Sequence, residues 1–221
     1  MKDLRITSLY NLNETIASDF MKQARYPWQL LSHINIGIME LGGTLSVDEF
    51  DQVASDIWIA KTATVAPTAV IEGPCIIDAG TEIHHATYIR GALIGKFAII
   101  ENSIVKNSLL FNWVHLTYNN YVCDSIIGSK TRIGAGATIS NNKADGTLVN
   151  IKAGKIVESA LKTIGAMLGD NVEIGCNSVL NPGTVVGRNS VVYPLSMVRG
   201  FIPENSIYKK QGEIVDRISA Y

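Results

Sequence analysis

Aliphatic residues recur at nearly every sixth position along most of the chain. Neither the 3.6-residue period of an α-helix nor the simple alternation of a single strand produces this spacing. Small or β-branched residues stand two positions before many of them, for example Ala69 before Ile71. The pattern runs in three registers, Val65–Ile100, Ile104–Ile139 and Leu168–Val198, with five-residue steps before Ile94 and Ile127.

Each six-residue unit is predicted to form one short strand followed by a corner, so that three units make one triangular coil. The aliphatic residues would fill the coil, and its backbone would pair with the coils above and below, ~4.8 Å away. Glycine follows several aliphatic residues, as in IIGSKTRIGAGATI, which suits turns with positive φ. The pattern resembles the left-handed parallel β-helix of hexapeptide-repeat acyltransferases over residues 57–208. We therefore expect an all-β fold of this kind.

The first 56 residues show helical rather than sixfold spacing. Asn13 can cap a helix over 14–24, and a second helical pattern over 28–41 ends at a glycine pair, a typical C-terminal cap. Residues 46–49 have the sequence of a capping box that opens a third short helix. We predict that 1–56 form a helical extension covering the first coil, whose strand edge would otherwise be exposed. Contacts with substrate or with another subunit are the alternative role.

Two further segments depart from the repeat. Residues 140–167 are too long for a corner and are predicted to project as an inserted loop, with a possible short helix over 157–165. Long loops within compact folds are usually functional. Residues 209–221 are predicted to form a C-terminal tail.

Composition limits the partners that the chain can bind. Its 221 residues carry a formal net charge of −1, and the 19 basic residues form no run, which argues against a nucleic-acid or anionic membrane surface. The sequence contains no run of about 18 apolar residues and no signal-peptide pattern, so we expect a cytoplasmic protein without a membrane span. The three cysteines are too widely spaced for a disulfide framework or a Cys-x-x-Cys metal site.

Several segments carry a resemblance to a known family: YPWQLL, GPCIIDAGTEI, YIRG, KNSLLF, YVCDSIIG, GAGATISNNK, GAMLGDNVEIGCNSVLNPGTVVGRNS and VRGFIPENSIY. They resemble the sugar-1-phosphate N-acetyltransferases and, more closely, short bacterial proteins described as UDP-N-acetylglucosamine pyrophosphorylase-related. The resemblance implies acetyl-CoA as cosubstrate, an amino-sugar phosphate as acceptor, and a homotrimer with sites between subunits. The nucleotidyltransferase half of the bifunctional family members has no counterpart in the sequence, so no pyrophosphorylase activity is expected.

The family resemblance implies a catalytic histidine within residues 107–125, where two alignments are possible. Matching the tetrapeptide HLTY literally makes His115 the base and Tyr118 its partner, but it requires a three-residue insertion. The gap-free alignment keeps the sixfold spacing of Leu110, Leu116 and Val122, and it places Tyr118 where the family has histidine. We favour this second alignment. A phenol with a pKa of ~10 is a poor base near neutral pH, so catalysis would be impaired unless His115 substitutes.

The same resemblance assigns further residues to substrate binding. Arg90 and Lys106 match the cations that bind the sugar phosphate, Tyr121 matches a tyrosine that contacts the sugar, and Lys143 is a second possible phosphate contact. Arg132 stands where the bifunctional enzyme has a sugar-binding asparagine, which puts glucosamine specificity in question. Solvated outward cations and, for Tyr121, a subunit interface are the alternative interpretations.

Three more positions are assigned to the acetyl group and its carrier. Asn141 matches an asparagine near the acetyl group and the amine, and the alternative is a corner residue in the left-handed conformation. Cys176 occupies a serine position near the thioester of coenzyme A, although a simply packed thiol is favoured. Arg199 is the candidate contact for a coenzyme A phosphate.

Histidines also suggest a comparison with zinc carbonic anhydrases that share this fold. Adjacent His84 and His85 point in opposite directions on a strand, so at most one could join His115, and no metal site is predicted. Two functions are therefore weighed. The first is an acetyl-CoA-dependent N-acetyltransferase acting on an amino-sugar phosphate or similar small amine. The second is a catalytically impaired protein that binds sugar phosphate, nucleotide or CoA.

Overall fold

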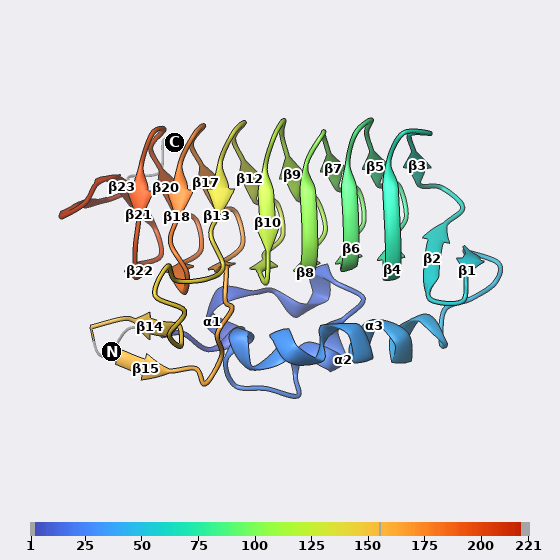
Figure 1. The fold of residues 1–221 in the computed structure, drawn as a ribbon, viewed down its shortest axis with the longest axis horizontal. Coiled ribbons are helices and arrows are strands. Elements are labelled where there is room, and N and C mark those ends of the chain that lie inside the picture. The colour runs from blue at the N-terminus through green and yellow to red at the C-terminus, as the bar shows by residue number, and fades with distance from the viewer. Residues whose placement is uncertain (1–2, 155, 218–221) are drawn as a thin grey trace.

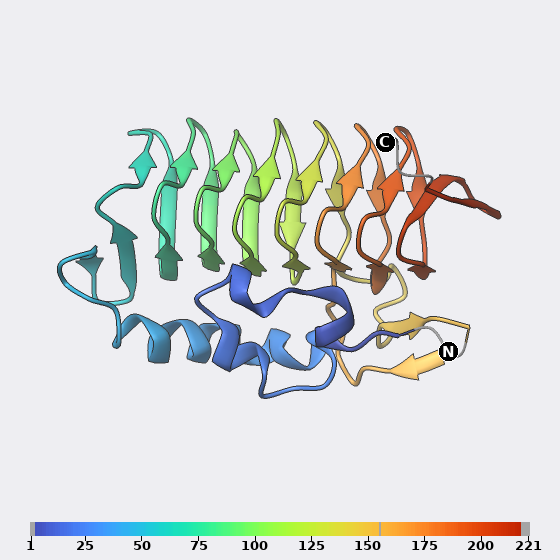
Figure 2. The same cartoon turned by 180° about the vertical axis from the view of Figure 1, so that it is seen from behind.

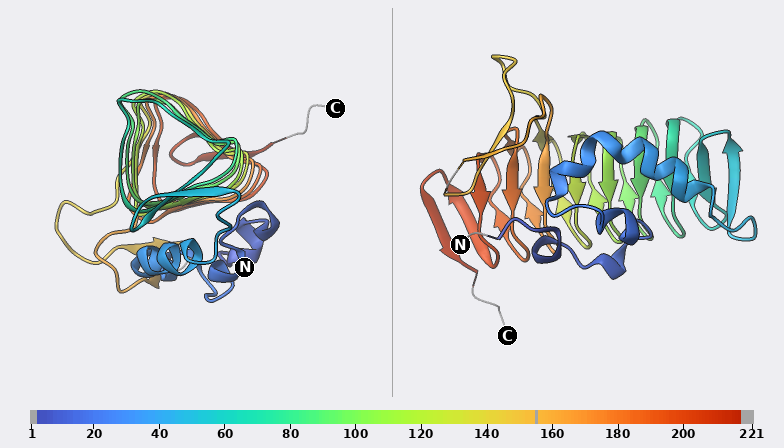
Figure 3. Two further views of the ribbon diagram at one scale, coloured as in Figure 1. Left: turned by 90° about the vertical axis from the view of Figure 1, so that its right-hand side faces the viewer. Right: turned by 90° about the horizontal axis from the view of Figure 1, so that it is seen from below.

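The computed structural model describes residues 3–154 and 156–217, in which short parallel strands wind into a triangular prism (Figures 1 and 3). The predicted all-β, left-handed parallel β-helix is confirmed. Short helices and a hairpin lie along one side of the prism (Figure 2).

Three faces make up the prism. We name two of them by an outward side chain, as the histidine face and the tyrosine face, and the third, which the helices cover, as the covered face. The histidine face contains β3 (Thr64–Val65), β5 (Glu82–Ile83), β7 (Ile99–Ile100), β9 (His115–Leu116), β12 (Arg132–Ile133), β17 (Glu173–Ile174), β20 (Val191–Val192) and β23 (Ser206–Lys210). The tyrosine face contains the first halves of β4 (Val70–Ile77), β6 (Tyr88–Ile94) and β8 (Ile104–Leu110), followed by β10 (Tyr121–Cys123), β13 (Thr138–Ile139), β18 (Val179–Leu180) and β21 (Met197–Val198). The covered face contains β2 (Ile57–Ala60), the second halves of β4, β6 and β8, then β11 (Ile126–Ile127), β16 (Ala166–Leu168), β19 (Thr184–Val186) and β22 (Phe201–Ile202).

The interior is filled by the recurrent aliphatic residues, which stack in register from coil to coil. Ile100, Leu116 and Ile133 face one another on successive coils and are fully buried. One register was predicted wrongly: Val105, and not Ile104, points inward, since Val105 is 0% exposed and Ile104 is 37% exposed. The coil shortens there by one residue, because five-residue steps separate Val105 from the inward residues on either side.

Glycines that follow the aliphatic residues serve a different purpose from the predicted one. Their φ angles are not positive; instead, a Cβ on Gly175 would lie 2.3 Å from Pro194 N, and one on Gly128 would lie 2.6 Å from Asp170 N. Glycine is therefore required by the close approach of neighbouring coils. Positive φ falls two positions later instead, for example at Gly136 (72°), Asn171 (57°) and Asn177 (54°).

The N-terminal segment lies along the covered face rather than over the first coil. It contains α1 (Ile6–Leu9), η1 (Leu12–Glu14), α2 (Ser18–Met21), η2 (Pro27–His33) and α3 (Ile34–Gly42). The covered face presents a second row of apolar side chains that point outward into a second core beneath these helices: Ile76, Leu93, Leu109, Ile126, Met167 and Val185. This row is visible in the sequence as aliphatic residues next to the inward ones.

Three predictions about residues 1–56 need correction. The helix predicted over 14–24 is reduced to α2, and Asn11, not Asn13, caps the preceding turn by accepting from the Asn13 backbone. Residues 46–49 form a turn and no helix, because the chain continues directly into β1 (Phe50–Ala54). β1 pairs antiparallel with β2 and so protects the edge of the first coil.

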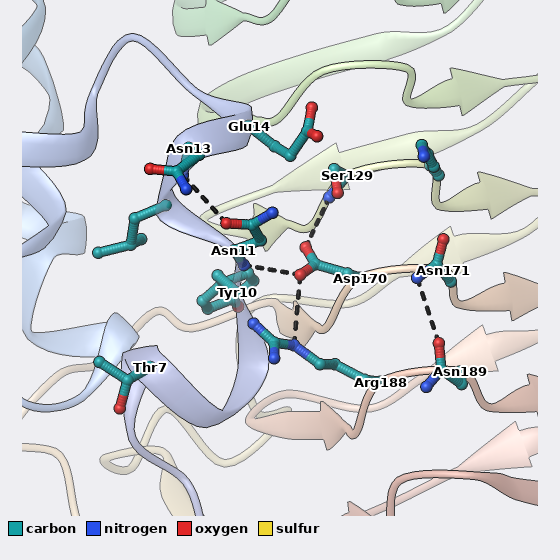
Figure 4. A pocket seen from close by; sticks show the side chains of 12 residues that line it. Thr7, Tyr10, Asn11, Asn13, Glu14, Ser129, Asp170, Asn171, Arg188 and Asn189 are labelled. Atoms are coloured by element: carbon teal, nitrogen blue, oxygen red, sulfur yellow. Dashed lines mark hydrogen bonds and ion pairs between the residues drawn. The ribbon is translucent and has the colours of Figure 1, made fainter.

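Asp170 fixes the N-terminal segment to the β-helix (Figure 4). Its buried carboxylate accepts hydrogen bonds from the backbone N–H of Asn11 (2.7 Å) and of Ser129 (2.9 Å), and Arg188 Nε lies 3.2 Å from Oδ2. Burial raises the pKa of Asp170, although these three groups favour its ionised form. Through Asp170, the contacts tie the turn before η1 to three successive coils.

The inserted segment forms an antiparallel hairpin, β14 (Asn150–Lys152) and β15 (Ile156–Glu158), and not the predicted helix. Alternation explains the difference, because Val149, Ile151 and Ala153 are all buried against the second core while the residues between them are not. The hairpin lies on the same side of the prism as the helices (Figure 3).

The predicted C-terminal tail is also partly structured. β24 (Glu213–Asp216) folds back antiparallel on β23 and extends the histidine face. Residues 218–221 of the predicted tail lie outside the described residues.

Asp78 is a buried carboxylate whose replacement should stabilise the protein. It is 1% exposed, and its Oδ1 accepts a hydrogen bond from Ala79 N at 2.7 Å, while its Oδ2 has no partner among the described residues. Burial raises the pKa of Asp78 above the ordinary 3.8. Burial of the ionised carboxylate lowers the stability of the folded state only when the group is charged. This loss of stability is absent below the ordinary pKa of the unfolded chain and is complete above the raised pKa of the folded protein. We expect Asp78→Asn, which leaves an unpaired amide donor but no buried charge, to raise the free energy of unfolding by about 1 kcal/mol at pH 7.

Chemical denaturation of Asp78→Asn at pH 7 and at pH 3 measures this effect, with the exposed Asp48→Asn as the matched control. The gain should vanish at pH 3, where the carboxyl group is protonated in both states. A gain of equal size at both pH values, or a loss at pH 7, would contradict the assignment.

Candidate functional site

The sequence-predicted site residues divide between two faces of the prism. His115, Tyr118, Arg132 and Cys176 line one cavity of about 620 Å³ on the histidine face and its corner with the tyrosine face. Arg90, Lys106 and Tyr121 lie on the tyrosine face. Lys143 and Arg199 line a separate cavity of about 490 Å³ beneath the hairpin, and Asn141 lies at the corner nearby. One chain therefore does not gather all predicted residues into one pocket.

His115 and Glu101 form a polar contact in the cavity of about 620 Å³. His115 Nε2 lies 3.0 Å from Glu101 Oε2, and the Glu101 side chain is only 15% exposed. Both project outward from neighbouring coils of the histidine face and both line the cavity. A carboxylate in this position fixes the orientation of the imidazole. Sequence reasoning missed Glu101, although its place directly after the inward Ile100 made it an outward residue one coil below His115.

The other two histidines on this side do not form a metal site with His115. His84 Nε2 contacts Glu82 Oε2 at 3.2 Å, and its Nδ1 is 3.9 Å from Glu101. His85 contacts Thr68 instead, with Nδ1 2.8 Å from Oγ1. Among the described residues, no group of three or more His, Cys, Asp or Glu side chains is arranged to hold a metal ion.

Tyr118 lies at the corner between the histidine and tyrosine faces and is 54% exposed. Its backbone carbonyl accepts from Gly136 N at 2.8 Å, and the next residue, Asn119, has φ of 60°. Leu116 and Val122 on either side are fully buried, so the chain has no slack for an insertion between them. The side chain of Tyr118 thus faces the same cavity as His115, from two residues past an inward position.

The cations of the tyrosine face are already partly neutralised. Arg90 Nε lies 3.7 Å from Glu72 Oε2, which also accepts a hydrogen bond from Tyr88 Oη at 2.7 Å. Lys106 Nζ lies over the Tyr88 ring, 5.0 Å from its centroid. Arg90 and Lys106 occupy opposite positions on adjacent coils. The pair therefore presents two neighbouring positive charges with one carboxylate at its edge.

Tyr121 shares its strand with Cys123. A hydrogen bond with Cys123 and, to a smaller extent, burial raise the pKa of Tyr121 to about 12. The phenol therefore stays protonated at neutral pH. Burial also raises the pKa of the Cys123 thiol. Tyr121 is accordingly a hydrogen-bond donor and not a base.

Asn141 is held by a carboxylate from the preceding coil. Asn141 Nδ2 donates to Asp124 Oδ2 at 2.6 Å, and Asn107 Nδ2 donates to Asp124 Oδ1 at 2.5 Å. The backbone of Asn141 does not adopt the left-handed conformation considered for it. The bond to Asp124 holds the side-chain amide of Asn141 in one orientation.

The remaining members of the large cavity are Arg132 and Cys176. Arg132 stands directly opposite His115 on the next coil. The Cys176 thiol is exposed at the corner and lines the cavity, so it is not the packed core thiol that the sequence favoured.

This fold defines the class: the chain is a hexapeptide-repeat β-helix protein. Two family profiles match it, "Bacterial transferase hexapeptide (six repeats)" over residues 165–200 and "GlmU-like, C-terminal hexapeptide" over residues 84–163. The similarity to GlmU and to other hexapeptide-repeat proteins is the one that the sequence indicated.

Curated relatives agree with these matches. The chain is 31% identical over 196 residues to the bifunctional protein GlmU of Methanococcus maripaludis strain S2, covering 86% of this chain and 47% of the relative. It is 29% identical over 195 residues to a bifunctional sugar-1-phosphate nucleotidylyltransferase/acetyltransferase of Sulfurisphaera tokodaii, covering 77% and 48%. The chain spans between 28% and 48% of the length of the first curated relatives that it matches.

Similarity to solved structures is more distant. A putative acetyltransferase of Bacillus cereus has a TM-score of 0.47 and 12% identity, covering 72% of this chain and 79% of that one. No helix among the described residues is long and apolar enough to span a membrane.

Proposed function

We propose that the protein is an acetyl-CoA-dependent N-acetyltransferase that acts on an amino-sugar phosphate or a similar small amine. The observation that carries the proposal is the His115–Glu101 pair, which lines a cavity together with Tyr118 and Cys176. A relative named as a nucleotidylyltransferase/acetyltransferase supports the reaction class.

In this reaction the amine lone pair attacks the thioester carbonyl, the C–N bond forms and the C–S bond breaks. The nitrogen must give up a proton, and the leaving CoA thiolate takes one up. His115 is the residue placed to accept the proton of the amine: with Nε2 donating to Glu101, Nδ1 is its basic nitrogen. The Glu101 carboxylate then stabilises the imidazolium that forms. We assign Tyr118, which aligns with the family's histidine, to positioning the acceptor.

The acceptor phosphate is assigned to the tyrosine face, where Arg90 and Lys106 are adjacent and Tyr121 supplies a hydroxyl donor. Since these side chains point away from the histidine face of their own chain, a complete site needs the tyrosine face of a second copy. Exposed apolar side chains on that face support self-association: Val70, Ile104, Val179 and Met197 are between 37% and 54% exposed. A homotrimer with three shared sites satisfies this requirement.

A second function is favoured by one observation, the tyrosine at position 118. If His115 cannot replace the family's base, the chain would bind a sugar phosphate, a nucleotide or CoA without turnover. Both functions keep the same cavities and differ only in chemistry.

Release of the CoA thiol from acetyl-CoA, with glucosamine-1-phosphate as acceptor, distinguishes the two. Glucosamine tests the phosphate requirement, and N-acetylglucosamine-1-phosphate, which has no free amine, is the blank. Amine-dependent thiol release supports the first function. Absence of turnover with a panel of amino-sugar phosphates, by the unaltered protein and by Tyr118→His alike, would overturn it.

A further inference from the structure

The cavity beneath the hairpin is separate from the one that contains His115. Its walls are the hairpin strand β14 on one side and, on the other, residues that directly follow the strands of the tyrosine face: Ser140 after β13, Asn181 after β18 and Arg199 after β21. Its volume is about 490 Å³.

The hairpin is seated firmly, so this cavity is built into the fold. Val149 and Ile151 are fully buried. Two corner glycines allow the close approach, because a Cβ on Gly183 would lie 2.9 Å from Val149 and one on Gly200 would lie 3.0 Å from the Lys152 carbonyl oxygen. Both glycines also have positive φ, which other residues rarely adopt.

Positive charge gathers in this cavity without matching negative charge. Lys143, Lys152 and Arg199 line it, against a single acid, Asp145. Asp145 is occupied by the backbone N–H and hydroxyl of Thr147, at 3.0 and 2.7 Å. Within the described residues, neither Lys152 nor Arg199 forms a salt bridge or a side-chain hydrogen bond, although they face the same cavity from opposite walls.

We propose that this cavity is a binding site for the phosphate groups of an extended ligand, held by Lys152, Arg199 and Lys143. An unpaired lysine and arginine on facing walls repel one another, and a phosphate between them removes that repulsion and accepts charge-assisted hydrogen bonds from both. Amide groups of Asn142 and Asn150 on the lining supply neutral donors beside the cations.

The length of the ligand follows from the position of the two cavities. Strands β13, β18 and β21 run from one to the other: Ala135, Cys176 and Pro194 line the His115 cavity, and residues five positions later line or border this one. Five residues of strand span roughly 16 Å. A sugar monophosphate cannot reach across, whereas a nucleotide-linked ligand or a CoA thioester can place its phosphates at one end and its reacting group at the other. Which ligand supplies the phosphates, a CoA thioester or a nucleotide-linked compound, rests on the proposed function. The binding of phosphate groups in this cavity does not depend on it.

Calorimetric titration of the full chain tests the proposal with two probes that need no turnover, adenosine 3′,5′-diphosphate and UDP. We expect one of them to bind, and Lys152→Ala and Arg199→Ala each to weaken that binding about tenfold or more, because a hydrogen bond to a charged group contributes that much to affinity. Lys162→Ala is the matched control, since Lys162 is an exposed lysine in the same inserted segment but outside the cavity.

The outcomes separate the sources and the two proposals. Binding of adenosine 3′,5′-diphosphate identifies CoA phosphates, and binding of UDP identifies a sugar nucleotide; either supports the site if the two cavity variants weaken it and Lys162→Ala does not. Failure of both probes to bind, or equal effects of all three variants, overturns the site. If the probe binds, if Lys152→Ala and Arg199→Ala weaken its binding and Lys162→Ala does not, and if the protein shows no acetyl transfer, the phosphate site is supported and only the proposed function is overturned.

Discussion

Replacing His115 with alanine is expected to lower kcat/KM for acetyl transfer by about 10²–10⁴-fold, the usual contribution of a general base. His115 is the base in the proposed mechanism, and its contact with Glu101 at 3.0 Å leaves Nδ1 as the nitrogen that accepts the proton. Glu101→Gln should have a smaller effect in the same direction, because the neutral amide still orients the ring but does not stabilise the imidazolium. Steady-state thiol release at saturating acetyl-CoA measures both variants.

His85→Ala is the matched control for this experiment, since that histidine contacts Thr68 outside the cavity and should leave the rate unchanged. Tyr118→Phe should reduce kcat/KM far less than His115→Ala if tyrosine only positions the acceptor. The reverse order of effects would make Tyr118 the proton acceptor and remove His115 from the mechanism. A large gain in rate for Tyr118→His, together with no change in rate for His115→Ala, would favour the second function, a protein whose catalysis is impaired by Tyr118.

Sixfold spacing was sufficient to predict the β-helix, because each inward residue is determined by its own hexad and not by distant contacts. The same spacing could not reveal a coil that shortens by a residue. Ile104 and Val105 are both aliphatic and adjacent, so composition does not say which one faces inward, and only pairing with the neighbouring coils decides it.

The arrangement of the site was less predictable than its members. Family resemblance nominated residues one at a time, and their division between two faces follows from the corner at 117–120, where the chain turns from one face to the next. Glu101 was missed because it belongs to no motif, and Asp124, although it lies in the segment YVCDSIIG, was not expected to contact Asn141. Each acts on a residue one coil away, 14 and 17 positions along the chain. Such partners could be found only by writing the sequence as stacked coils and reading across them.

The N-terminal segment was predicted less well in its location than in its helical character. Its amphipathic character was recognisable, but its location was mispredicted because the edge of the first coil seemed the surface most in need of cover. The outward apolar row on the covered face is the larger requirement. That row has the same sequence signature as the inward row, displaced by one position, and it determines where the helices lie.

A charge placed in that row should therefore release the N-terminal segment. Leu109 is 1% exposed and lies at the end of β8 beneath the helices, so Leu109→Asp removes a buried aliphatic side chain and buries a carboxylate without a partner. We expect a loss of more than about 4 kcal/mol in the free energy of unfolding, or detachment of residues 3–42 with the β-helix intact. Limited proteolysis, with cleavage sites identified by mass spectrometry, detects detachment directly.

Ile104→Asp is the matched control because Ile104 belongs to the same strand and also points outward, but on the tyrosine face. It should leave the N-terminal segment as resistant to protease as in the unaltered protein, whatever it does to self-association. Equal sensitivity of both variants would mean that the helices are held by general stability and not by the covered face. Rapid cleavage within residues 3–42 of Leu109→Asp alone would instead show that the outward aliphatic row of the covered face holds the helices, because it forms one side of the second core. Since that floor also buries Val149 and Ile151 of the inserted segment, the same variant should loosen the hairpin and weaken phosphate binding in the cavity beneath it, although Leu109 lines neither cavity.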